Sequence, residues 1–175
     1  AAPHATPAAY PGTCRDLDPE IAADRIARGD PYALRLHTDR ACRATAPLRY
    51  HEATEGWITA DPTPHGDIVL ARKDTPFSYH LCVTHDDAIQ GVTLVTRGND
   101  LRATTPIHIL LQRLFGWPTP AYAHHPLLTD ASGRRLAKRD RAASLRDLRA
   151  AGTTPDDIRK IISCRIGDLA SLSFP

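Results

Sequence analysis

Apolar and polar positions alternate with two different periods along this chain. Period-two alternation and runs of β-forming residues predict strands over residues 32–38, 67–74, 77–87, 91–100 and 121–130. The turn-rich stretch 48–66 between them is compatible with two further short strands. Apolar residues spaced three and four positions apart predict helices over residues 18–29, 105–115, 141–152 and 154–167.

Two of these helices carry recognisable end signals. Asp18 precedes Pro19, a pair typical of a helix N-cap followed by the first turn. Thr105 is the expected cap of the next helix, which Gly116 and Pro118 end. Strands alternate with helices through the middle of the chain, so we expect an α/β layer with a helical C-terminal end.

Length and composition indicate a folded protein domain of ordinary kind. The 175 residues are 42% hydrophobic and 24% charged, which suits one domain or one piece of a larger protein. A net charge of +2 is too small to indicate a nucleic-acid partner by itself. No apolar run approaches the roughly 20 residues that a membrane span needs, and the first residues do not resemble a signal peptide. The four cysteines show no CxxC pair, so we expect no disulfide framework and a cytoplasmic location.

The first candidate for chemistry is the stretch YPGTC, residues 10–14. A cysteine thiolate is a good zinc ligand and a tyrosine oxygen an occasional one, which makes Tyr10 and Cys14 candidate metal ligands. A structural zinc site needs about four ligands, however, and no His or Cys pair with ligand spacing lies beside these two. Taken alone, the stretch favours a Pro-Gly turn next to a buried cysteine.

The second candidate is the block from residue 79 to residue 100. If two parallel strands end here, Asp86, Asp87, Arg97 and Asp100 lie at the carboxyl edge of the sheet, where open α/β folds bind ligands. Arg97 is suited to hold a carboxylate with two hydrogen bonds, and Tyr79 to donate a hydroxyl hydrogen bond to an amino acid. The alternative is that Tyr79 packs in the core and the charged residues cap turns.

The third candidate is the basic stretch SGRRLAKR after the last predicted strand. A lysine on such a loop can reach a polyphosphate and stabilise the charge that develops there. Taken alone, the stretch is more typical of a solvated basic turn. Two tryptophans, Trp57 and Trp117, are interpreted as packing residues rather than as platforms for nucleic-acid bases. His124 and His125 are interpreted as polar residues of a strand edge, with contact to ATP as the alternative.

In order along the chain, these segments resemble class I aminoacyl-tRNA synthetases of the glutamyl type. The most specific segment is VTLVTRGNDL followed by TP and LQRLFG, and the resemblance runs from about residue 10 to about residue 152. Within that family the chain is most similar to the short glutamyl-Q tRNA(Asp) synthetases, which lack an anticodon-binding domain. YPGTC resembles the second half of their zinc site, and the chain ends soon after the lysine loop.

The resemblance implies roles for individual residues. Tyr79 and Arg97 match the positions that hold glutamate, and Tyr10 and Cys14 match two zinc ligands. The loop of Arg135, Leu136, Ala137, Lys138 and Arg139 takes the place of the KMSKS loop. Lys138 matches the lysine that contacts ATP and is the implied catalytic residue.

The chain also departs from the family pattern. It contains no HIGH-type motif, no first pair of zinc cysteines and no N-terminal glutamate-binding residues, so it corresponds to the C-terminal part of the enzyme. Ala137 replaces the KMSKS serine, a change that we expect to be tolerated because Lys138 keeps the charge. Thr84 and His85 stand where the family has valines.

The implied organisation has three parts. Residues 1–30 are the remnant of a zinc-binding region with the helix after it. Residues 31–128 are the second half of a Rossmann-like catalytic domain with an acceptor-side insertion, and residues 129–175 are the KMSKS-like loop with C-terminal helices. The implied activity is ATP-dependent formation of glutamyl-adenylate, followed by transfer of glutamate to the queuosine of tRNA(Asp). Its ligands are L-glutamate, ATP, Mg²⁺ and tRNA(Asp), with Zn²⁺ at an incomplete site, and we expect a monomer that does not bind membranes.

Two alternatives belong to this interpretation. One is the catalytic domain of an ordinary glutamyl-tRNA synthetase, which esterifies the 3′ end of tRNA. The other is a tRNA-binding module without catalysis, which the missing HIGH motif favours for the 175 residues alone.

Overall fold

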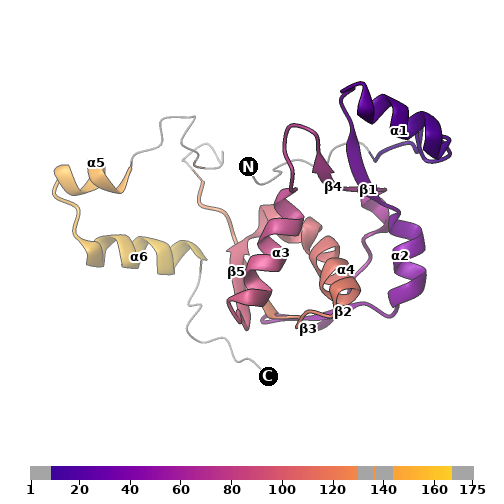
Figure 1. Cartoon of the computed structure of the whole chain (residues 1–175). Helices are drawn as coiled ribbons and strands as arrows, with labels where there is room; N and C mark the ends of the chain where they lie inside the picture. The colour runs from indigo at the N-terminus through magenta and orange to yellow at the C-terminus, as the bar shows by residue number, and fades with distance from the viewer. Residues whose placement is uncertain (1–8, 130–135, 137–143, 167–175) are drawn as a thin grey trace.

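The computed structural model describes residues 9–129, 136 and 144–166 (Figure 1). Its α-helices are α1 (Pro19–Ala27), α2 (Thr38–Thr45), α3 (Tyr79–Ile89), α4 (Thr105–Phe115), α5 (Leu145–Ala150) and α6 (Pro155–Ile166). Its strands are β1 (Ala33–Leu36), β2 (Arg49–Glu52), β3 (Gly56–Thr59), β4 (Ile68–Arg72), β5 (Leu94–Gly98) and β6 (Ala121–His125). Two short 3-10 helices are η1 (Thr63–His65) and η2 (Asn99–Thr104). None of the described helices is long and apolar enough to cross a bilayer.

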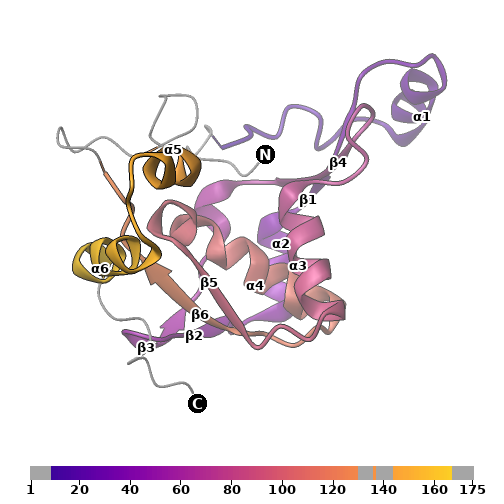
Figure 2. The same ribbon diagram turned by 90° about the vertical axis from the view of Figure 1, so that its left-hand side faces the viewer.

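The strands form two sheets of different character. In the larger sheet the order is β3-β2-β6-β5, and β6 runs parallel to both β2 and β5, while β3 is antiparallel to β2. The smaller sheet is the antiparallel pair β1–β4, from which α1 projects (Figure 1). In both views α3 and α4 lie side by side against the larger sheet, and α5 and α6 lie away from them (Figure 2). The α/β class is therefore as the sequence predicts, and the parallel partner of β5 is β6 rather than residues 77–87.

Helix α4 contributes more residues to the core than any other described element. Its four buried apolar side chains, Ile107, Ile109, Leu110 and Leu111, lie in one cluster with the sheet tyrosines Tyr50 and Tyr122. These two tyrosine rings meet edge to face with centroids 5.4 Å apart.

One predicted strand is wrong. Residues 77–87 lie mostly in helix α3, whose N-cap Ser78 accepts a hydrogen bond from the Leu81 N–H at 3.3 Å. The inward positions recur at helical spacing and include His80, Thr84 and Asp87. Because these inward residues are polar, the sequence shows no apolar stripe at helical spacing. The β-forming residues between them then lead to the prediction of a strand.

This correction moves part of the predicted ligand-binding edge. Asp86 and Asp87 belong to α3 rather than to the end of a strand. Arg97 does lie near the carboxyl end of β5, and Asp100 follows in η2. The other strands and the four predicted helices are present, with bounds shifted by a few residues, and Asp18 caps α1 through its bond to the Glu20 N–H at 2.7 Å.

Candidate amino-acid site at the carboxyl ends of β5 and β6

Arg97 is the centre of a polar cluster beneath the carboxyl ends of the parallel strands. It lies opposite His124 of β6 in the sheet register. Its Nε donates to His124 Nε2 at 3.1 Å, its Nη1 to His108 Nδ1 at 3.0 Å and its Nη2 to Thr105 Oγ1 at 2.5 Å. A guanidinium carries five N–H groups. Three are used by these neighbours, so two remain for a ligand.

The side of the cluster formed by Glu52 and His124 is fully enclosed. Glu52 is 0% exposed, and its carboxylate accepts from the His124 backbone N–H at 3.0 Å and from the ring Nδ1 at 2.6 Å. This bond places the ring proton on Nδ1 and leaves Nε2 as the acceptor for Arg97. Burial, the largest cause, lowers the pKa of His124 although the hydrogen bond to Glu52 opposes it. The histidine is therefore a neutral bridge between a buried anion and Arg97.

A second histidine pair lies on the other side of Arg97. His108 accepts from Arg97 through Nδ1, so its Nε2 donates to His80 Nδ1 at 3.0 Å. Burial lowers the pKa of His108 well below its ordinary value, and burial with the charges of His65 and Arg97 lowers the pKa of His80 to about 4. Burial also lowers the pKa of Arg97, but a guanidinium stays charged in proteins. Near neutral pH, Arg97 therefore supplies the positive charge of this cluster.

Tyr79 and Arg97, the two predicted glutamate-binding residues, are brought to the same place. The Tyr79 ring lies 5.5 Å from the His80 ring and 6.2 Å from the His108 ring, measured between centroids. Arg97 also lies 5.1 Å above the Tyr122 ring, whose burial raises the pKa of Tyr122 to about 12. Among the described residues no carboxylate forms an ion pair with Arg97. A charged guanidinium with spare donors beside a tyrosine is chemically suited to bind a carboxylate.

Several members of the cluster are missing from the sequence prediction. Thr105 is predicted to cap α4, but the N-cap is Thr104, and the Thr105 hydroxyl instead lies between Arg97 and His124. The interpretation of His124 as a strand-edge residue is wrong, because only 7% of it is exposed. His108 lies between two isoleucines in an apolar helix. A polar residue at such a core position is the sequence feature that could have identified it as a member of the site.

The predicted zinc ligands Tyr10 and Cys14 lie together but do not form a metal site. The Cys14 backbone N–H donates to the Tyr10 hydroxyl at 2.6 Å, and the Arg35 guanidinium lies 4.1 Å above the Tyr10 ring. Cys14 is exposed rather than buried. Across residues 9–129, 136 and 144–166, no group of three or more His, Cys, Asp or Glu residues is arranged to hold a metal. The described residues therefore give no support for zinc, and the roles of Tyr10 and Cys14 stay a prediction.

The predicted ATP loop falls almost entirely outside the described residues. Arg135, Ala137, Lys138 and Arg139 are among those outside, so the catalytic role of Lys138 stays a prediction. Leu136 is described, and its N–H donates to the Leu128 carbonyl at 2.9 Å.

The two polar departures in α3 have structural partners. Thr84 is 1% exposed, and its hydroxyl donates to the His80 carbonyl at 2.6 Å, which satisfies it inside the helix. His85 is exposed and meets Trp117 edge to face at 5.6 Å between centroids. Neither change introduces an unpaired buried group.

Known proteins resemble this chain at the level of both sequence and fold. Residues 2–167 match the family described as tRNA synthetases class I (E and Q), catalytic domain. The chain is 46% identical over 157 residues to the glutamyl-Q tRNA(Asp) synthetase of Rhodobacter capsulatus, covering 87% of this chain and 55% of that protein. It is 43% identical over 166 residues to the glutamyl-Q tRNA(Asp) synthetase of Nocardia farcinica, covering 95% and 51%.

Glutamate–tRNA ligases are also similar. That of Thermus thermophilus is 35% identical over 158 residues, covering 90% of this chain and 33% of that protein. A crystal structure of a glutamate tRNA ligase from Elizabethkingia meningosepticum, in complex with its amino acid, superposes with a TM-score of 0.58 at 25% identity over 75% of this chain and 27% of that chain. The chain spans about half the length of the glutamyl-Q relatives it matches. The chain belongs to the catalytic-domain family of the class I glutamyl- and glutaminyl-type tRNA synthetases.

Proposed function

We propose that this chain supplies the amino-acid side of an active site that activates glutamate with ATP and transfers it to the queuosine of tRNA(Asp). The observation that carries the proposal is Arg97, a largely enclosed cation with two N–H groups unused and no described carboxylate paired with it. Family membership supports the reaction class, and the higher identity to glutamyl-Q relatives than to glutamate–tRNA ligases supports the acceptor.

In the first step, a carboxylate oxygen of glutamate attacks the α-phosphorus of ATP. A new bond forms between that oxygen and phosphorus, the bond to the β-phosphate oxygen breaks, and pyrophosphate leaves. Arg97 pairs with the side-chain carboxylate and Tyr79 hydrogen-bonds the amino acid, which leaves the α-carboxylate to react. This step requires no general base, because positioning and charge neutralisation supply the catalysis.

We assign neutralisation of the phosphate charge to Lys138 of the KMSKS-like sequence. Mg²⁺, when bound with ATP, would neutralise further phosphate charge. In the second step, a nucleophilic group of the queuosine attacks the carbonyl carbon of glutamyl-adenylate, and AMP leaves.

Amino-acid-dependent exchange of pyrophosphate into ATP tests the activation step. With the full-length protein we expect exchange with glutamate and at least about 100-fold slower exchange with glutamine at equal concentration, because glutamine lacks the charge that Arg97 pairs with. Equal rates with the two amino acids would contradict the role given to Arg97.

The 175-residue chain alone is the matched sample in the same assay. Since it contains no HIGH-type motif, we expect no measurable exchange from it. Exchange at the full-length rate would refute the conclusion that these residues hold only one side of the ATP site.

A further inference from the structure

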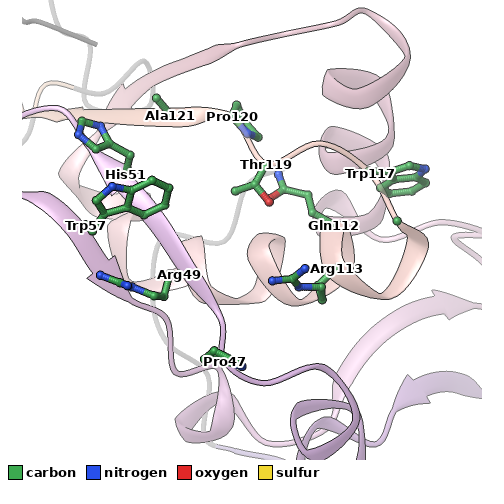
Figure 3. A pocket seen from close by; sticks show the side chains of 11 residues that line it. Pro47, Arg49, His51, Trp57, Gln112, Arg113, Trp117, Thr119, Pro120 and Ala121 are labelled. Atoms are coloured by element: carbon green, nitrogen blue, oxygen red, sulfur yellow. The ribbon is translucent and has the colours of Figure 1, made fainter. Parts of the chain in front are cut away.

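A pocket lies at the opposite end of α4 from the Arg97 cluster. Thr105 and His108, in the first half of the helix, contact Arg97, whereas Gln112 and Arg113 at its end line the pocket (Figure 3). The remaining walls come from β2, β3 and the segment before β6. Its volume is about 550 Å³, within the range of small-molecule sites.

An exposed aromatic ring forms one wall. Trp57 on β3 is 61% exposed, so the interpretation of this residue as packing is wrong. Its ring meets His51 edge to face at 5.7 Å, and the Arg49 guanidinium lies 5.6 Å from its centroid. Trp117, at the other wall, stacks on Phe115 with centroids 4.5 Å apart. The exposed Trp57 ring in a concave site favours a ligand with a flat aromatic face.

A buried polar atom of the wall lacks a partner. Gln112 is only 1% exposed, and its Nε2 donates to the Tyr122 hydroxyl at 3.1 Å, but its Oε1 has no hydrogen-bond partner. The same is true of His51 Nδ1. Exchanging the two ends of the Gln112 amide would leave an N–H unpaired instead. An unsatisfied buried polar group costs about 1–3 kcal/mol, and a ligand group that donates to Oε1 from the pocket would offset that cost.

Two positive charges flank the same pocket. Arg49 comes from β2 and Arg113 from α4, and neither forms an ion pair with any carboxylate in the described part of the chain. Arg102 and Arg159, by contrast, both bind carboxylates at 2.6 Å. Two unneutralised guanidiniums from separate elements favour an anionic group, and the planar fork of arginine suits phosphate.

We propose that this pocket binds a nucleotide, with the base against Trp57 and hydrogen-bonded to Gln112, and the phosphate between Arg49 and Arg113. A simple anion leaves the exposed ring and the Gln112 amide unused, and an uncharged aromatic molecule leaves both arginines unused. The nucleotide is a free mononucleotide or an unpaired nucleotide of an RNA strand. This site is separate from the proposed glutamate site and does not depend on it.

Tryptophan fluorescence tests the proposal directly, because both tryptophans of the chain line the pocket. We expect saturable quenching by cytidine 5′-monophosphate with a dissociation constant at or below about 1 mM. Cytidine has the base but no phosphate, and inorganic phosphate has no base. Each should therefore bind at least about 10-fold more weakly than cytidine 5′-monophosphate. A five-residue oligocytidylate is the second arm. Quenching by the mononucleotide identifies a free nucleotide as sufficient, and quenching by the oligonucleotide alone identifies an RNA strand.

The double variant R49Q/R113Q should raise the dissociation constant at least about 10-fold, since both phosphate-binding forks are lost. R28Q, which removes an exposed arginine beyond the end of α1, is the matched control and should bind as the parent chain does. Arg113 also complements the C-terminal end of α4, so circular dichroism melting of each variant should accompany the titration. The proposal is wrong if neither probe quenches saturably, or if a folded R49Q/R113Q binds as tightly as R28Q.

Discussion

Replacing Arg97 by glutamine should raise the KM for glutamate in ATP–pyrophosphate exchange by about 100-fold or more. Removing one partner of an enclosed, hydrogen-bonded charge pair costs about 2–5 kcal/mol, and about 2.8 kcal/mol, below the middle of that range, corresponds to a factor of about 100. Arg97→Lys keeps the charge but loses the planar fork, so its KM should lie between those of the parent protein and Arg97→Gln.

Arg97 also donates to His124, His108 and Thr105, and its removal takes one hydrogen bond from each of these groups. Thermal unfolding must therefore be measured with the kinetics, and Arg97→Lys provides the variant that disturbs the cluster least. Arg43→Gln, an exposed position on α2, is the matched control. Unchanged glutamate affinity in a folded Arg97→Gln would remove this residue from the site.

Replacing Lys138 by alanine should lower the rate of exchange at saturating glutamate by about 10²–10³-fold, the usual effect of losing one group that stabilises transition-state charge. The KM for glutamate should change little, because the lysine is assigned to the phosphates and Arg97 to the amino acid. Lys160→Ala removes an exposed lysine on α6 and should leave the rate unchanged.

The neighbouring Ala137 provides a second comparison at the same loop. Ala137→Ser restores the KMSKS serine hydroxyl, and we expect the rate to rise by no more than a few-fold, because a neutral hydroxyl contributes less than a charged lysine. Full activity in Lys138→Ala would exclude the loop from the first step.

The sequence predicts the class of fold because most elements carry consistent local signals. Helix α4 combines apolar spacing with Pro106 and Gly116, and β5 and β6 are short runs of β-formers that pair in parallel. Helix α3 lacks such agreement, because its inward face carries His80 and Thr84 in place of apolar residues. His80 belongs to the candidate site, and its partner His108 becomes visible only when α4 is packed beside α3.

The candidate site is predictable in part for the same reason. Arg97 and Tyr79 are identified by their resemblance to a family pattern, and the structure brings them together even though Tyr79 begins a helix rather than lying in a strand. The Glu52–His124 hydrogen bond joins residues 72 positions apart in the sequence, so no local sequence pattern predicts it. Trp57 shows the converse, since a tryptophan that would ordinarily pack in a core lies open on a pocket wall.

The most direct test of the central claim is transfer of labelled glutamate by the full-length protein with ATP. Three acceptors should be compared: tRNA(Asp) containing queuosine, tRNA(Asp) lacking it, and tRNA(Glu). We predict that label enters only the tRNA(Asp) that contains queuosine, and that it stays in the anticodon fragment after nuclease cleavage. Label at the 3′ end of tRNA(Glu), with none in queuosine-containing tRNA(Asp), would contradict the account and identify the chain as part of an ordinary glutamyl-tRNA synthetase.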